Sequence, residues 1–408
     1  MGKKLFSLCM ALVLCLGLLP VTALAAEEIK LFIGGQQITE SGCYENQNGT
    51  WTKVDGTEPA SGQFYYDADT VTLTLNGAEI SHNENVCVGS DTYYYGSVIA
   101  FSQSADVSLN IVVSQRTSTI TGNGGIRVMS EAGDASLSIS GPGSLEVKNV
   151  SNDSGIVLIG SKNVNLGINS ADVTISDVQY YGVNLAAGDE CKSTATINDG
   201  NLTVSDSVVG IYFMRLYTSG PSSLTVSGNA VVDTRNSQIM AQNKETVVQV
   251  GAGSDGNGGI VFDGKSGTVY GDVTLQENLT IGEGETLTVP EGSSLNCNEK
   301  LTNNGTILAS GGTVSGQLKN GTTVTTPSIT GQPQNKKVTA GETAEFSVTA
   351  TAGSETPTYQ WQQSTDSGSN WTDISGATSA SYTINSTTIS MSGYQYRCVV
   401  KSASGVSV

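Results

Sequence analysis

Histidine is almost absent from this chain, since His82 is the single one among 408 residues. A serine hydrolase triad needs a histidine base, and a zinc site of the Cys/His type needs several ligands at close spacing. His82 lies in the polar stretch AEISHNENV, where a solvated side chain is the usual state. The chain also lacks a glycine-rich phosphate loop between a strand and a helix. These absences argue against triad hydrolases, zinc enzymes and phosphate-loop proteins.

Basic residues are also scarce. The chain has 19 Lys and Arg against 37 Asp and Glu, which gives a formal net charge of −18. An acidic chain without basic clusters repels phosphate backbones, so no nucleic-acid partner is expected. Charged residues make up only 14% of the whole, while Val, Ile, Leu and Thr alternate with Gly, Ser and Asn. This composition is typical of all-β proteins and not of disordered ones.

Long apolar runs are missing after the first residues. The chain begins with the basic MGKK, continues with LFSLCMALVLCLGLLP, and then offers Ala23 and Ala25 as a small-residue cleavage site. This pattern predicts a signal peptide over residues 1–25. No later run is long enough for a membrane span. The expected location is therefore secreted and extracellular, with attachment to the cell surface left open.

Cysteines are few once the signal peptide is removed. The five that remain, an odd number spread far apart, do not form a disulfide scaffold. Cys43 and Cys87 are the only pair to consider, because both lie in the irregular N-terminal part. Cys297 and Cys398 are expected to be core thiols.

A repeat of about 28 residues is the main positive feature of the sequence. Its apolar centres are Ile120, Val147, Ile175, Val204 and Val232. Glycines recur with the same period, and each repeat carries three short alternating segments. Such segments cannot stand alone, but each can pair in parallel with its copy one repeat away. The sequence predicts a right-handed parallel β-helix of about nine three-strand coils over residues 71–326, preceded by a β hairpin or cap region over residues 26–70.

The sequence pattern changes near Pro327. The segments TYQWQQSTDSGSNWTDI and SGYQYRCVV resemble bacterial immunoglobulin-like domains. The resemblance places Trp361 at the strand-C tryptophan, Cys398 at the strand-F cysteine and Tyr396 at the tyrosine corner. Val348 stands where the first cysteine belongs, so the inter-sheet disulfide is not expected. Residues 327–408 are predicted to be such a domain, with its last strand incomplete, and the resemblance implies a spacer or adhesive module.

Two acidic residues could carry chemistry. Asp177 and Asp206 occupy equivalent corners of consecutive coils, where paired carboxylates could hold Ca²⁺ or act as a glycosidase or lyase pair. The alternative is a pair of solvated corners, since Asn149 and Thr234 hold the neighbouring places. No other cofactor or metal is expected. A polar column of Ser144, Asp172, Asn201 and Asn229 is interpreted as a structural ladder that turns inward.

Aromatic residues gather near the coil glycines. Tyrosine rings on a rigid polar surface suit sugars, whose C–H faces stack on rings while their hydroxyls bond nearby polar groups. The alternative is that some of these rings simply pack on loops. The candidate carbohydrate-binding residues are Tyr94, Tyr95, Tyr180, Tyr181, Tyr212, Arg127 and Arg215.

In layout the repeat region is similar to secreted carbohydrate-binding β-helix proteins of bacteria and, more distantly, to pectate-lyase-like solenoids. The opening LFIGGQQIT and YYDADTVTLTLNGAEI carry this resemblance. Carbohydrate-binding members tend to carry Asp before the coil glycine, and only Asp153 matches here. The resemblance implies a non-catalytic glycan-binding or adhesive protein whose partner is a polysaccharide or a host or cell-wall glycan. A β-helix polysaccharide lyase or glycoside hydrolase, and a structural surface stalk, are the alternatives.

Overall fold

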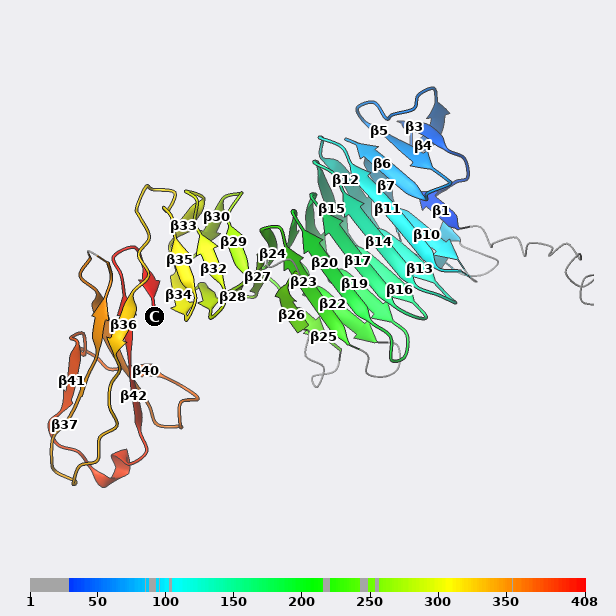
Figure 1. Cartoon of the computed structure of the whole chain (residues 1–408). Helices are drawn as coiled ribbons and strands as arrows, with labels where there is room; N and C mark the ends of the chain where they lie inside the picture. The colour runs from blue at the N-terminus through cyan, green and yellow to red at the C-terminus, as the bar shows by residue number, and fades with distance from the viewer. Residues whose placement is uncertain are drawn as a thin grey trace, which may run out of the picture.

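The computed structural model describes residues 29–84, 86–87, 93–94, 96–102, 105–215, 221–242, 249–253, 257–353 and 355–408. The predicted signal peptide, residues 1–25, lies outside them. The described chain is all-β with almost no helix, and η1 (Ile389–Met391) is a single short 3-10 turn. Its main body is a β-solenoid of about five turns, drawn from cyan to green in Figure 1.

Three large sheets form the solenoid, and each regular coil gives one strand to each of them. Sheet A contains, in spatial order, β2 (Gln36–Ile38), β1 (Lys30–Ile33), β10 (Val98–Ser102), β13 (Ile126–Ser130), β16 (Ile156–Gly160), β19 (Tyr181–Ala187), β22 (Val209–Arg215) and β25 (Ile239–Ala241). Sheet B contains β26 (Gln249–Ala252), β23 (Ser222–Ser227), β20 (Ser193–Asn198), β17 (Val164–Asn169), β14 (Ala135–Ser140), β11 (Val107–Val113), β6 (Thr72–Asn76), β5 (Gln63–Asp67), β3 (Gly42–Gln47) and β4 (Thr50–Val54).

Sheet C runs on into the C-terminal part of the chain. It contains β7 (Glu79–His82), β12 (Ser118–Gly122), β15 (Ser144–Val150), β18 (Asp172–Val178), β21 (Asn201–Val204), β24 (Ala230–Thr234), β27 (Gly259–Asp263), β28 (Ser266–Tyr270), β31 (Thr286–Pro290), β34 (Thr306–Ser310), β43 (Val406–Ser407), β42 (Gln395–Lys401), β39 (Thr358–Ser364) and β40 (Thr372–Asp373). The smaller sheets contain β29 (Asp272–Thr274), β32 (Ser294–Asn296) and β35 (Thr313–Ser315); β30 (Leu279–Ile281) and β33 (Leu301–Asn303); β36 (Ser328–Gly331) and β38 (Thr349–Thr351); β37 (Ala344–Ser347) and β41 (Ser381–Ile384); and β8 (Val86–Cys87) and β9 (Tyr93–Tyr94).

Parallel pairing between successive coils builds the core. Ile120 pairs with Val147, Val147 with Ile175, and Ile175 with Val204, so this part of the predicted inward column is confirmed. The last step was wrong, because Val232 pairs with Leu202 and not with Val204. The turn at Gly228 and Asn229, both with positive φ, lengthens this coil and shifts the register.

The N-terminal strands close the first edge of the stack. β1 runs antiparallel to β10 in sheet A, and the β3–β4 hairpin with β5 extends sheet B antiparallel to β6. Tyr44 stacks on Phe64 with ring centroids 5.1 Å apart, and Trp51 packs on the same ring. Cys43 is a buried free thiol here, so the considered bridge to Cys87 is not seen.

The parallel stacking is interrupted between β27 and β28. These two strands are antiparallel, with Ile260 opposite Val269 and Asp263 opposite Ser266. Val261 belongs to the core of the first stack, whereas Ile260 and Phe262 belong to a second core that continues through β34. The chain therefore reverses direction at this point, and the second core lies on the other face of sheet C. One uninterrupted stack of about nine coils is thus not confirmed.

The C-terminal strands form a separate small core. Val348, Trp361, Ala377 and Val400 are buried together. β43 joins this unit to the solenoid, because it pairs antiparallel with β42 on one side and parallel with β34 on the other. Val406 in β43 is fully buried in the core of the second stack.

Candidate functional site

The outer face of sheet A collects most of the described candidate residues. Its strands align one lateral column in register, which consists of Ile99, Arg127, Val157, Asn184, Tyr212 and Met240. Inward residues on either side of the column, such as Leu185, are fully buried in the solenoid core. We call the part of this surface made by Arg127, Asp153, Tyr180, Tyr181, Asn184 and Tyr212 the tyrosine face.

The two central tyrosines stack on each other. The Tyr181 and Tyr212 ring centroids lie 4.5 Å apart with an interplanar angle of 22°, and both side chains are half-buried. Desolvation, and then the nearby Tyr181, raise the pKa of the Tyr212 phenol. Tyr212 therefore stays neutral and can donate its O–H at physiological pH. Tyr180, which directly precedes Tyr181 in the chain, is 47% exposed.

Arg127 is held by an ion pair. Its side chain is only 11% exposed. Its Nη2 pairs with Asp153 Oδ2, while Nη1 contacts Met129 Sδ at 3.5 Å. Asp153 is the one position that matches the Asp-before-glycine pattern expected from the resemblance to carbohydrate-binding β-helix proteins. Here its carboxylate is engaged by Arg127. Among the described residues, no group of three or more His, Cys, Asp or Glu side chains could hold a metal ion.

Asn184 is the residue of this face that the sequence reasoning missed. It is 8% exposed, and in the described structure its Oδ1 is buried without a hydrogen-bond partner. An unpaired buried acceptor of this kind costs about 1–3 kcal/mol. Its position was open to prediction, because Val183 and Leu185 are inward and an alternating strand turns the residue between them outward.

The remaining aromatic and basic candidates are only partly placed. Tyr94 lies in β9 and Arg215 at the end of β22, where it aligns with Ala187, but their side chains lie outside the described structure. Tyr95 also lies outside the described residues.

Asp177 and Asp206 do occupy equivalent corners of consecutive coils. Both are exposed, and the Val178 amide donates to the Asp206 carbonyl at 3.0 Å. Their φ angles are +52° and +49°, and Asn149, one coil earlier, has φ +54°. Asn and Asp tolerate left-handed backbone better than other side chains. The corner geometry therefore accounts for these residues without a catalytic or calcium-binding role.

A second candidate surface lies on the outer face of sheet C. A cleft of about 570 Å³ is lined by Glu146, Asp172, Thr174, Thr203 and Asp233, with the loop that contains Asn278 as its wall. We call it the junction cleft.

The polar column of Ser144, Asp172, Asn201 and Asn229, which the sequence predicts to turn inward, lines the junction cleft instead. Asn201 Nδ2 donates to Asp172 Oδ1 at 2.8 Å, and Asn229 Oδ1 accepts from the Thr274 amide at 2.6 Å. The inward interpretation was wrong, because Leu145, Val173 and Leu202 fill the inward positions next to Ser144, Asp172 and Asn201.

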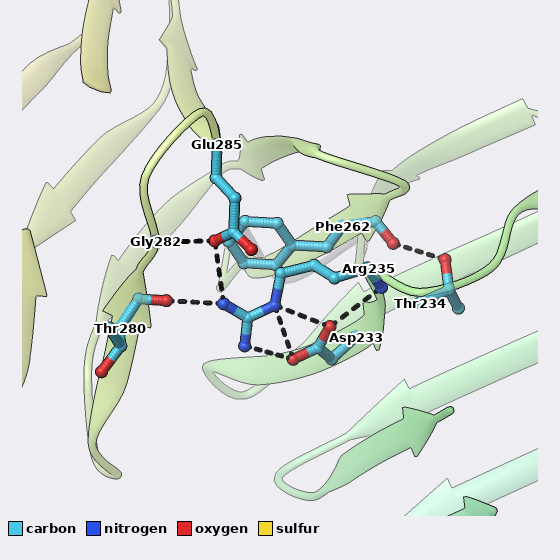
Figure 2. Close-up of polar contacts among 7 residues, drawn as sticks. All are labelled: Asp233, Thr234, Arg235, Phe262, Thr280, Gly282 and Glu285. Carbon is cyan, nitrogen blue, oxygen red and sulfur yellow. Dashed lines mark hydrogen bonds and ion pairs between the residues drawn. The ribbon is translucent and has the colours of Figure 1, made fainter. Parts of the chain in front are cut away.

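Arg235 belongs to the lining of the junction cleft, and its contacts are drawn in Figure 2. Its guanidinium pairs with Asp233 at 2.6 Å and with Glu285 at 3.1 Å, and donates to the Thr280 carbonyl at 2.6 Å. It also lies 4.8 Å above the centroid of the Phe262 ring. The bonds to Asp233, followed by those to Glu285, raise the pKa of Arg235. This clamp ties the first stack to the second.

Comparison with known proteins adds one family match. Residues 328–408 match a family described as a domain of unknown function (DUF8696). The match covers the C-terminal unit alone, and it does not confirm the predicted immunoglobulin-like identity. No curated protein and no solved structure matches the chain. In the part of the chain that the structure describes, no helix is long and apolar enough to cross a bilayer.

Proposed function

We propose that this protein is a secreted or cell-surface glycan-binding protein without catalytic activity, and that the tyrosine face is its site. The observation that carries the proposal is the buried, unpartnered Asn184 Oδ1 beside the stacked Tyr181–Tyr212 pair. The oxygen is covered in the free protein, so the side chain must turn outward before a sugar hydroxyl or acetamido N–H can donate to it. Binding would remove a penalty that the free protein carries.

The neighbouring groups fit the same ligand. Tyr180 offers an exposed ring on which a sugar C–H face can stack, and Tyr212 offers a neutral phenol. Arg127 is neutralised by Asp153, so the face does not select strongly for charged sugars. A polysaccharide or a host or cell-wall glycan of neutral type is therefore the proposed partner.

The lyase or hydrolase alternative has no comparable support. Its pair, Asp177 and Asp206, lies at solvated corners whose left-handed backbone favours Asp. The stalk alternative is an outcome of the experiment below.

The test is binding of the full chain to a glycan array and to insoluble polysaccharides, together with a reducing-sugar assay. Tyr181→Ala with Tyr212→Ala should lose retention on the bound glycan, and Asn184→Ala should weaken it about tenfold or more. The matched control is Thr174→Ala with Thr203→Ala in the junction cleft, which should retain binding. If only the control variant loses retention, the site is the cleft and not the tyrosine face. Release of reducing ends would favour the enzyme, and an absence of both binding and cleavage would favour the stalk.

The proposal also includes the hand of the solenoid, its number of coils, the identity of the C-terminal unit and the signal peptide. We infer right-handed winding, because parallel crossovers take that hand almost without exception. Counted together with the shorter coils after β28, the solenoid would approach the nine coils predicted. An immunoglobulin-like identity for residues 327–408 is supported by the fully buried Trp361, by Val348 in the same core and by the half-buried thiol of Cys398. The signal peptide over residues 1–25 is part of the proposal as well.

A further inference from the structure

The exposed large apolar side chains of the solenoid gather in one region. Five such side chains are exposed among the described residues, and two of them, Val338 and Ile389, lie in the C-terminal unit. The other three are Tyr180, which is 47% exposed, Val208, which is 70% exposed, and Met240, which is 41% exposed. Apolar groups that stay together on a surface mark a binding site more often than scattered ones do.

Strand pairing relates these three residues to the stacked tyrosines. Met240 in β25 aligns with Tyr212 in β22, one coil earlier. Tyr180 directly precedes Tyr181, and the Val208 amide donates to the Tyr180 carbonyl at 2.9 Å, so Val208 occupies the same corner one coil later. Successive coils lie about 4.8 Å apart. The tyrosine face therefore continues into apolar side chains along the column and at the corner that leads into sheet A.

The polar groups of the face set a second requirement. Asn184 aligns with Tyr212, and its buried Oδ1 has no hydrogen-bond partner among the described residues. Tyr212 adds a phenol O–H donor. An acetamido group carries one N–H donor, one carbonyl acceptor and one methyl group, so it can use the acceptor, the donor and the apolar surface together. A sugar hydroxyl can make either hydrogen bond, but it leaves the apolar surface uncovered.

We propose that the tyrosine face selects 2-acetamido sugars, and that its ligand is a glycan rich in N-acetylhexosamine. This inference rests on the proposed glycan-binding function and narrows it from neutral sugars in general to N-acetylated ones. Asn184 Oδ1, once its side chain turns outward, accepts from the acetamido N–H, and Tyr212 donates to the acetamido carbonyl. The methyl group packs against the apolar surface that extends to Met240.

Two uncharged tetrasaccharides test the selection, because they share chain length and linkage and differ only in the group on the second ring carbon. The tetramer of N-acetylglucosamine carries acetamido groups there, and cellotetraose carries hydroxyls. Titrated against the full chain, the acetamido tetramer should bind about tenfold more tightly, from one buried methyl group and one added hydrogen bond. Equal affinity, or tighter binding of cellotetraose, would overturn the selection and leave glycan binding itself in place. Binding of neither tetramer would also overturn it, and the glycan array would then decide separately whether the protein binds any glycan.

Variants test whether the selection belongs to the tyrosine face. Met240→Gln keeps the length of the side chain but ends it in an amide, and it should reduce the affinity ratio of the two tetramers to about threefold or less. Tyr212→Phe keeps the ring and removes the phenol donor, and it should weaken the acetamido tetramer about fivefold. Val338→Gln is the matched control, because Val338 is 39% exposed in the C-terminal unit, and it should keep the ratio. An unchanged ratio in Met240→Gln, or a reduced ratio in Val338→Gln, would contradict the assignment.

Discussion

Single residues at the entry to sheet A decide whether coils can stack. A Cβ atom added at Gly182 would lie 2.2 Å from Val204 Cγ1 and 2.7 Å from the Gly210 carbonyl oxygen of the next coil. Gly125 and Gly155 meet the following glycine carbonyl in the same way, at 1.9 and 2.8 Å. The periodic glycine therefore reflects close approach between coils.

Gly182→Ala should destabilise the solenoid by about 1–3 kcal/mol, because the added methyl group overpacks this corner. Urea unfolding of the variant and the wild type measures the loss. Gly251→Ala is the control, since a Cβ there meets nothing within 4 Å. Equal midpoints for Gly182→Ala and Gly251→Ala would contradict the stacking argument.

Burial of the Cys297 thiol predicts that the stability of the folded state depends on pH. Cys297 lies in the second core, and desolvation raises its pKa from 9.0 to about 12. The unfolded thiol ionises first, so the folded state loses stability as pH rises from about 9 toward 12, and keeps it in full below this window. The difference in unfolding midpoint between wild type and Cys297→Ala should therefore shrink with rising pH. A constant difference across that window would count against the burial argument.

Among the elements, the junction between β24 and β31 depends on Arg235. Without its guanidinium, Asp233 and Glu285 would face each other as largely buried carboxylates. Arg235→Gln should cost about 2 kcal/mol and speed hydrogen exchange in β30 and β33. Lys148→Gln breaks the more exposed pair with Glu146 and should cost less than about 1 kcal/mol. The clamp argument fails if the two variants are equally stable.

Strand-level features show what the sequence could predict. Alternation and spacing identify the inward residues from Ile120 to Val204, because each successive strand buries the same face against the core. Alternation and spacing do not reveal the reversal of the chain between β27 and β28. Ile260 and Val261 are both apolar, so the sequence does not show which of the two cores each side chain enters. Likewise Tyr181, Tyr212 and Arg127 could be placed on one face. In contrast, the sequence could not predict that Asn184 Oδ1 lacks a hydrogen-bond partner, because this depends on which groups surround it in three dimensions.

At the scale of the whole molecule, charge predicts how a glycan would be held. The chain carries a formal charge of −18, so binding to neutral sugars must depend on stacking and neutral hydrogen bonds. Salt screens long-range attraction but leaves ring contacts in place. Retention on a glycan that binds at the tyrosine face should therefore survive moderate salt. A steep loss between low and moderate salt would indicate an ionic ligand.

The C-terminal unit and the second stack should unfold together, because one strand belongs to both. β43 lies between β34 and β42, Val406 is fully buried in the second core, and Ser404 Oγ accepts from the Thr325 amide at 3.1 Å. Val406→Asp buries an unpaired carboxylate in this seam, which costs several kcal/mol, about 3 or more. Hydrogen exchange measured across urea concentrations should then show β34 and β42 losing protection at the same lower midpoint. β15, in the first stack, should change little. Val338→Asp is the matched control within the C-terminal unit, since Val338 is exposed. If β42 loses protection in Val406→Asp while β34 keeps it, the two units fold independently and the shared strand does not couple them.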